Sequence, residues 1–235
     1  MLIKEQSPSK NPRTTVLMGL PKIGKTTIAA QLDNSLLIDF ERGTEFVTHP
    51  SVASVTNYAD LRVLFKEIME KQKGSNPYKY CIWDTVTGLE MHLNRHIAGE
   101  HGVSSIEEIA YGAGYGALRS KLMSVLDWFT NQFDHLVVLG HLKKRFIERT
   151  NGKLDTEFEI ELTGKLAPIF MSQMDSIGLL FREKKEVFCK FLEASEDDEV
   201  IIGSRVSRLD GNVLQLTKGR KDGVPIADWS EIFLT

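Results

Sequence analysis

The chain is poor in cysteine, has no long apolar run and carries no excess of positive charge. Its 235 residues include only two cysteines, Cys81 and Cys189, each within an apolar run. A disulfide framework and a cysteine-based zinc site are therefore not indicated, and we expect two buried thiols on strands. No apolar stretch approaches the length that spans a bilayer, and residues 1–13 lack the apolar core of a signal peptide. These absences favour a cytoplasmic protein without membrane contact.

The formal net charge is −3, so no overall positive field draws the protein to nucleic acid. Any such contact must come from a local patch. Hydrophobic residues make up 42% of the chain and charged residues 26%, which is enough for a full core. Because no repeat, low-complexity tract or linker divides the sequence, we predict a polar tail over residues 1–13 and one domain over residues 14–235.

Strands and helices alternate in the first part of the chain. Short β-rich runs predict strands over residues 14–18, 35–40, 78–83 and 135–139, and apolar stripes predict helices near residues 26–33, 60–73 and 118–129. After Gly140, the Asn151-Gly152 pair and the alternation over 154–162 predict a hairpin. Further short strands are predicted over 176–182, 186–192, 199–205 and 213–216. We therefore predict an α/β fold, with a mainly parallel central sheet flanked by helices and antiparallel strands added by the C-terminal third.

The strongest motif is Gly19-Leu20-Pro21-Lys22-Ile23-Gly24-Lys25-Thr26, which matches the P-loop pattern G-x-x-x-x-G-K-[ST]. A predicted strand precedes the loop and a helix follows it, so successive backbone N–H groups can surround phosphate oxygens. Lys25 is expected to reach the β- and γ-phosphates of ATP, and Thr26 to ligate Mg²⁺. The predicted nucleotide-binding residues are Gly19, Pro21, Lys22, Ile23, Gly24, Lys25, Thr26 and Thr27.

Two carboxylates follow predicted strands. Asp84 ends the apolar run Tyr80–Trp83, as a Walker B aspartate must do to meet Mg²⁺ or its water, although many strands end in an aspartate that caps a turn. Asp39 and Glu41 follow the strand over 35–40. We predict that Glu41 polarises the water that attacks the γ-phosphate, and that Asp39 supports the loop; the alternative is a solvated acidic pair.

These residues together resemble the RecA/KaiC-type P-loop ATPases. The resemblance implies that Glu41 is the catalytic glutamate, that Asp84 is the Walker B aspartate, and that His141 is the sensor of the γ-phosphate, where this family more usually has Gln. It also implies a homo-oligomer in which Lys218 and Arg220, in a late Lys-x-Arg, reach the neighbouring subunit's nucleotide. The alternative for this short match is an exposed basic turn.

The segment Tyr111–Gly116 and the wording of the P-loop are similar to phage-type RecA-like ATPases, some of them recombinases or single-strand annealing proteins. The resemblance implies action on single-stranded DNA in phage recombination or replication, in a bacterium or a phage-infected host. Two regions would be the DNA-binding loops, residues 92–119 and 142–165. The candidate contacts are Arg119, Lys143, Lys144, Arg145 and Arg149. Alternatively, the basic residues of the second region pair across the hairpin with Glu157, Glu159 and Glu161.

The preferred hypothesis is therefore a Mg²⁺-dependent, RecA-like ATPase acting on single-stranded DNA. One alternative is a P-loop nucleoside or nucleotide kinase, in which the carboxylate would act on an acceptor instead of water. Another is an ATP-switched module, without catalysis, that loads a partner protein.

Overall fold

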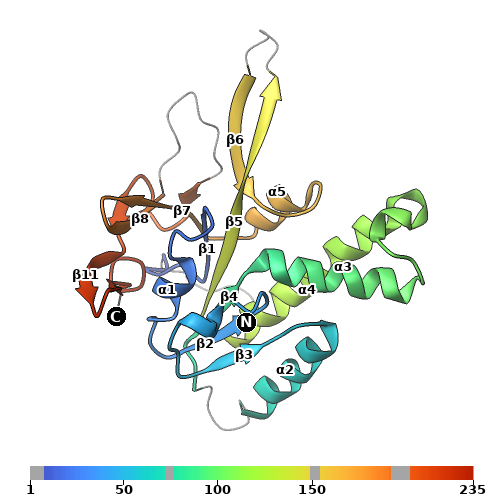
Figure 1. Ribbon diagram of the computed structural model, residues 1–235, viewed down its shortest axis with the longest axis horizontal. Coiled ribbons are helices and arrows are strands. Elements are labelled where there is room, and N and C mark those ends of the chain that lie inside the picture. Colours follow the sequence, from blue (N-terminus) through green and yellow to red (C-terminus); the bar gives the residue numbers. More distant parts are fainter. Residues whose placement is uncertain (1–7, 72–76, 149–153, 192–201, 235) are drawn as a thin grey trace.

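A computed structural model describes residues 8–71, 77–148, 154–191 and 202–234, without the side chains of residues 144–148 and 154–157. One large mixed sheet organises the chain, with the strand order β10-β8-β7-β1-β5-β4-β2-β3 along its main path (Figure 1). Its strands are β1 (Thr14–Gly19), β2 (Ser35–Asp39), β3 (Val52–Ser54), β4 (Tyr80–Asp84), β5 (His135–Glu148), β7 (Ser176–Glu183), β8 (Glu186–Lys190) and β10 (Val213–Gln215).

The central strands are parallel. β1 lies between β5 and β7, and β4, β2 and β3 follow on the far side of β5, all in parallel register. β1, β2 and β4 are buried along their whole lengths, as strands covered on both faces must be, which is why they read as continuous apolar runs. Since parallel strands end at the same edge, this register brings Gly19 beside His141 and Asp39 beside Asp84.

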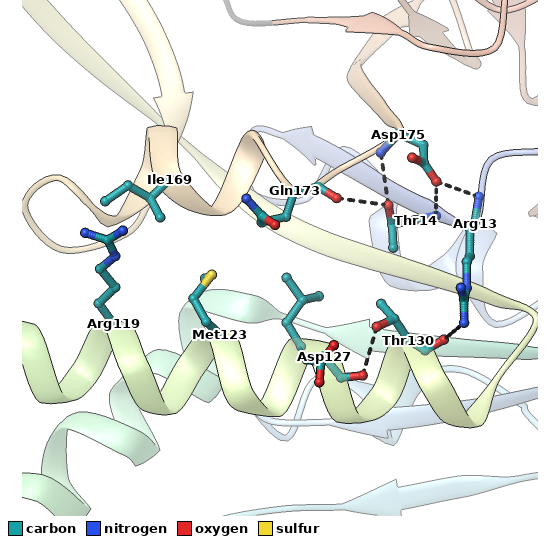
Figure 2. Close-up of a pocket in the computed structure, with 10 residues that line it drawn as sticks. Arg13, Thr14, Arg119, Met123, Asp127, Thr130, Ile169, Gln173 and Asp175 are labelled. Carbon is teal, nitrogen blue, oxygen red and sulfur yellow. Dashed lines mark hydrogen bonds between the residues drawn. The ribbon is translucent and has the colours of Figure 1, made fainter. Parts of the chain in front are cut away.

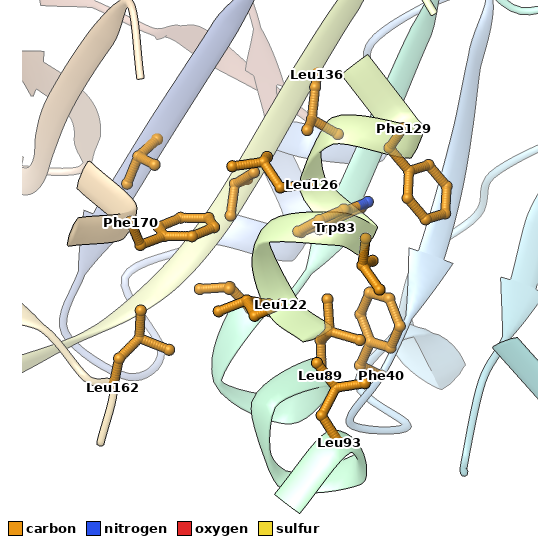
Figure 3. Close-up of a cluster of buried hydrophobic side chains, with 14 of the residues drawn as sticks. Phe40, Trp83, Leu89, Leu93, Leu122, Leu126, Phe129, Leu136, Leu162 and Phe170 are labelled. Atoms are coloured by element: carbon orange, nitrogen blue, oxygen red, sulfur yellow. The ribbon is translucent and has the colours of Figure 1, made fainter. Parts of the chain in front are cut away.

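Helices cover both faces of the sheet. α2 (Tyr58–Lys71), α3 (Val86–Glu100), α4 (Ala113–Gln132) and α5 (Leu166–Met171) contribute to one apolar core, in which Trp83 meets Phe129 edge to face (Figure 3). The short α1 (Lys25–Ala29) and the C-terminal residues Trp229 and Phe233 contribute to the second core. Successive side chains of each strand enter opposite cores, Val16 and Met18 the first and Leu17 the second. Cys81 and Cys189 are free buried thiols on strands, as predicted.

β5 is one continuous strand of 14 residues, so the predicted strand over 135–139 ended too early. It pairs in antiparallel register with β6 (Leu154–Ile160), and the two project from the body as a hairpin (Figure 1). Gly140 permits the transition, because a Cβ there would lie 2.4 Å from Cδ1 of Ile160. The predicted hairpin is confirmed, with Lys143 opposite Glu159 and Arg145 opposite Glu157.

The prediction that the C-terminal third adds only antiparallel strands is wrong for β7, which is parallel to β1. After the hairpin, α5 returns the chain to the amino edge of the sheet, where the amide of Asp175 bonds the carbonyl of Thr14. β8 and β10 are antiparallel, as predicted, and β9 (Gly203–Ser204) pairs with β7. Residues 199–201 of another predicted strand lie outside the described residues.

β11 (Thr217–Lys221) and β12 (Val224–Ala227) form a separate two-stranded sheet that packs against α1. The Gln31 side chain donates to the carbonyl of Pro225 and accepts from the amide of Ala227, and the Trp229 indole donates to the carbonyl of Ile28. The helix that follows the P-loop is therefore held by the C-terminal part of the chain.

The two ends of the described chain are hydrogen-bonded to each other. The Asn11 side chain bonds both main-chain groups of Leu234, and the Arg208 guanidinium bonds the carbonyls of Lys10 and Ile232. Residues 10 and 11, within the predicted tail, are thus attached to the domain; the domain limits stay a prediction. Within the described residues, no helix is long and apolar enough to cross a membrane.

Gly178 provides a test of the close packing between β7 and β8. A Cβ at Gly178 would lie 2.3 Å from Sγ of Cys189 and 3.1 Å from Leu17, so Gly178→Ala should lower the free energy of unfolding by about 1–3 kcal/mol in a urea titration. The added substitution Cys189→Ala should recover part of this loss. Gly99→Ala, where an added Cβ meets nothing within 4 Å, is the control, and an equal loss in both single variants would contradict the packing argument.

Candidate nucleotide-binding site

The P-loop curls between β1 and α1. Gly24 has φ 109°, a left-handed conformation that side chains disfavour, and it forms the N-cap of α1. Gly19 is packed from below, because a Cβ there would lie 3.1 Å from Cβ of Leu180 on β7. The loop therefore follows the curved path that the motif predicts.

Lys25 is buried at the base of this loop, with 6% of its surface exposed. Its Nζ donates to the carbonyls of Gly19 and Leu20 at 3.0 and 3.1 Å. Burial lowers the pKa of Lys25, whereas the charges of Asp84 and Glu41 raise it. A buried ammonium group whose hydrogen bonds go to neutral carbonyls is a favourable partner for an anion, which would exchange these acceptors for charged oxygens.

Thr26 and Asp84 meet across the site. The Thr26 hydroxyl donates to Oδ2 of Asp84 at 2.6 Å. Burial raises the pKa of Asp84 to about 6, although the Thr26 hydrogen bond and the charge of Lys25 act to lower it. The fold therefore holds a carboxylate that gains from a nearby cation.

Glu41 lies at the other side of the site, between two hydrogen-bond partners. The Thr85 hydroxyl donates to Oε1 of Glu41, and Nε2 of His141 lies 3.0 Å from Oε2. Burial raises the pKa of Glu41, but the hydrogen bonds from His141 and Thr85 and the charge of Lys25 outweigh it, so this pKa lies below its ordinary value. Glu41 is thus ionised at neutral pH and fixed in direction.

Asp39 organises the loop that carries Glu41. Its carboxylate accepts hydrogen bonds from the amides of Glu41, Gly43 and Thr44 and, at 2.6 Å, from the Thr44 hydroxyl. These bonds outweigh burial and lower the pKa of Asp39. This geometry is what the supporting role expected of Asp39 requires.

Gly88, in the first turn of α3, sets the distance between that helix and the Glu41 loop. A Cβ at Gly88 would lie 2.6 Å from Cγ of Glu41 and 2.9 Å from Cβ of Phe40. Gly88 also donates its amide to the Thr85 hydroxyl, the same group that bonds Glu41. Gly88 and Thr85 together fix where Glu41 can point.

The donor set fits Mg²⁺ that is bound mainly through phosphate. Thr26 and Asp84 supply hard oxygen ligands, which Mg²⁺ prefers. Among the described residues, no group of three His, Cys, Asp or Glu side chains could hold a metal alone. A cation here would therefore depend on the phosphates to complete its coordination.

The structure brings Lys25, Thr26, Asp84, Glu41 and His141 into one chain of contacts. Lys218 and Arg220 lie elsewhere, on the exposed β11, and have partners within the same chain. Lys218 forms a 2.6 Å ion pair with Asp228, and Arg220 bonds the carbonyls of Gly223 and Lys185. Action in trans would require both side chains to exchange these partners.

The first predicted DNA-binding loop, residues 92–119, is wrong as a loop. Residues 92–100 belong to α3 and Arg119 lies on α4, so only residues 101–112 connect the helices. His92 is buried against the carbonyl of Phe40, and His96 stacks on Tyr58, so these histidines are helical packing residues and not loop residues. The apolar stripe of α3 is short, which explains why the sequence did not reveal this helix.

In the second predicted DNA-binding region, Lys143, Lys144 and Arg145 lie on β5, just beyond His141. Lys143 is exposed; the side chains of Lys144 and Arg145, and all of Arg149, lie outside the described residues.

Sequence reasoning missed Arg182, at the end of β7. Its guanidinium donates to the carbonyl of Ile23 within the P-loop at 2.9 Å. Because β7 was expected to be an added antiparallel strand, nothing placed Arg182 near the nucleotide. The roles of Thr85 and Gly88 were missed as well, although Thr85 directly follows the predicted Walker B aspartate.

Fold and site together define a class. The strand order β7-β1-β5-β4-β2, with the P-loop after β1, acidic residues after β2 and β4, and His141 on the intervening β5, is that of a RecA-like P-loop nucleotide-binding ATPase. The chain belongs to the AAA domain family, whose model matches residues 11–220.

Other comparisons add less. No curated protein matches the chain. One of 147 matching solved chains is described as an ATPase domain; it is 11% identical, the match covers 88% of this chain and 80% of that one, and the TM-score is 0.47. At this level of similarity the match carries no argument about activity.

The raised pKa of Asp84 predicts how stability depends on pH without nucleotide. Its ordinary value of 3.8 rises to about 6, so the folded state holds a proton that the unfolded state releases between these values. The resulting stabilisation is complete below pH 3.8 and is lost as the pH rises through 6. Asp84→Asn, which stays neutral, should therefore be more stable than the wild type at pH 7.5 by roughly 1–3 kcal/mol. Urea titrations should show this difference shrinking toward pH 4; a constant difference would disprove the linkage.

Gly88→Ala should displace Glu41 and leave the P-loop intact. We expect kcat for ATP hydrolysis to fall by a factor on the order of ten to a hundred, while the Kd for nucleotide changes little. Gly99→Ala, on the same helix but in open space, should change neither value. Thermal melts of both variants show whether each is folded at the assay temperature. Unchanged kcat in folded Gly88→Ala would mean that this contact does not position Glu41.

Proposed function

We propose that the chain binds ATP with Mg²⁺ at the P-loop and hydrolyses it, with Glu41 activating the attacking water. The observation that supports this most is the setting of Glu41, held by Thr85 and His141 while its charge acts on the buried Lys25. In this proposal the P-loop residues Gly19 and Pro21–Thr27 bind the triphosphate, and Thr26 and Asp84 hold the metal or its water.

The chemistry assigned to the chain is simple. Glu41, ionised because of its lowered pKa, accepts a hydrogen bond and then a proton from the water whose oxygen forms the new bond to the γ-phosphorus. The bond from the γ-phosphorus to the bridging oxygen breaks, and ADP leaves. Lys25 neutralises the charge on the phosphate oxygens, and the bound metal ion would supply further charge neutralisation.

His141 is proposed to report the state of the site. It contacts Glu41 through Nε2, and its Nδ1 is buried without a partner in the described part of the chain. A change in the hydrogen bond to Glu41 would act on β5, the strand that continues into the projecting hairpin. This supports the γ-phosphate sensor role proposed for His141.

We further propose that a homo-oligomer acts on single-stranded DNA in phage recombination or replication, with Lys218 and Arg220 acting in trans. Lys143, Lys144, Arg145 and Arg149 are proposed as DNA contacts on the hairpin, and Arg119 on α4. The position of the hairpin beyond His141 supports this part. The register that sets Lys143 opposite Glu159 and Arg145 opposite Glu157 reduces its net positive charge, and so counts against it.

ATP hydrolysis with Mg²⁺, measured with and without single-stranded DNA at two salt concentrations, tests the proposal. Lys25→Ala should abolish nucleotide binding, while Glu41→Gln should bind ATP and lose roughly 10²–10⁴-fold in turnover. DNA stimulation that weakens with salt would support the DNA part. Hydrolysis indifferent to DNA would contradict that part alone. Transfer of the γ-phosphate to an added nucleoside would favour the kinase alternative, and tight binding without turnover the partner-loading alternative.

A further inference from the structure

Phe46 is an exposed aromatic residue next to the nucleotide site, with 92% of its surface accessible. It ends the single turn Thr44–Phe46, five residues after Glu41. The turn is fixed, because Asp39 binds both the amide and the hydroxyl of Thr44, and the amide of Val47 bonds the carbonyl of Thr44. A ring held in water by an ordered turn leaves a large apolar surface without a partner in this chain.

An apolar groove lies elsewhere on the same chain, between α4 and α5. It encloses a cavity of 420 Å³, whose walls include Tyr115, Leu118, Leu166 and Ile169. The groove continues into the neighbouring cavity of 440 Å³ between the same helices, where Arg119 and Ile169 face each other (Figure 2). It is therefore large enough to receive a side chain from outside.

The charges beside the ring and the groove are complementary. Glu45, exposed, directly precedes Phe46, whereas the groove is bordered by Arg119 and Lys165, both exposed. Neither cation makes a hydrogen bond or an ion pair with another described residue. An acidic and aromatic pair on one surface thus matches an apolar groove with a basic border on another.

We propose that Glu45 and Phe46 of one copy dock into the α4–α5 groove of a second copy. Phe46 would lie against Leu166 and Ile169, with Glu45 near Arg119 and Lys165. Because the two surfaces differ, the contact is head to tail, and it repeats into a ring or a filament. An apolar groove with only two cations suits an aromatic side chain better than the phosphates of a nucleic acid.

This inference deepens the proposed oligomer by naming its contact. The loop that carries Phe46 also carries Glu41, and Asp39 orders both through the same carboxylate. Docking of a second copy would therefore fix the loop that aims Glu41. Self-association can nevertheless be measured without hydrolysis.

Sedimentation velocity of the full chain over a range of concentrations, with and without ATP and Mg²⁺, is the first test. Phe46→Ala should weaken self-association by about tenfold or more, as loss of a central aromatic contact does. Val63→Ala, which removes an apolar side chain that is 55% exposed on α2, should leave it unchanged.

A mixing experiment tests the head-to-tail geometry. Gly116→Trp should fill the groove, since a Cβ at Gly116 meets nothing within 4 Å, and Gly99→Trp is the control in equally open space. Phe46→Ala keeps the groove and Gly116→Trp keeps the docking turn. Each variant should be monomeric alone, and a mixture should form a one-to-one dimer.

Three outcomes would overturn the inference: a wild-type chain that stays monomeric, a Phe46→Ala chain that associates as tightly as wild type, or protection of Phe46 and the groove by single-stranded DNA alone. ATP binding, measured in the same samples, separates the two proposals. Association through Phe46 without ATP binding would refute the proposed function and leave this inference standing.

Discussion

The parallel register of β1, β5, β4 and β2 is the constraint on which the site depends. It sets the end of β1 beside His141 and the end of β2 beside Asp84, so side chains far apart in the sequence meet at one edge. The contacts that follow are short and specific, such as the hydrogen bond between Thr26 and Asp84. A slip of one residue in any of these strands would turn its functional side chain into the core.

The same arrangement places charge where the fold disfavours it. Lys25 and Asp84 are both almost fully buried, and burial moves the pKa of each toward its neutral form. Asp39 and Glu41 differ, because several hydrogen bonds hold each of them ionised. The site therefore contains two classes of charged group: those that the protein itself satisfies, and those that gain most from a charged ligand.

Much of the fold was predictable from the sequence because its central strands are apolar throughout and the P-loop motif has a strict spacing. Residues 154–160 were correctly placed in a hairpin by the Asn-Gly pair and the alternation. β7 was assigned to the wrong kind of strand, because its crossover α5 is six residues long and contains Pro168, and so leaves no helical stripe. Gly88 and Arg182 could not be found, since their importance lies in distances to Glu41 and Ile23 that depend on how elements pack, and no local pattern encodes such distances.

The hydrogen bonds of Asn11 and Arg208 have a consequence for the topology of the chain. They place residues 10 and 11 beside residues 232 and 234, so the two ends of the described polypeptide are adjacent in space. A short peptide could therefore join the ends without crossing the sheet, and the chain could be opened at another surface turn. Such a circularly permuted protein would keep every strand in its register, because the order of the strands in the sheet does not depend on where the polypeptide is cut.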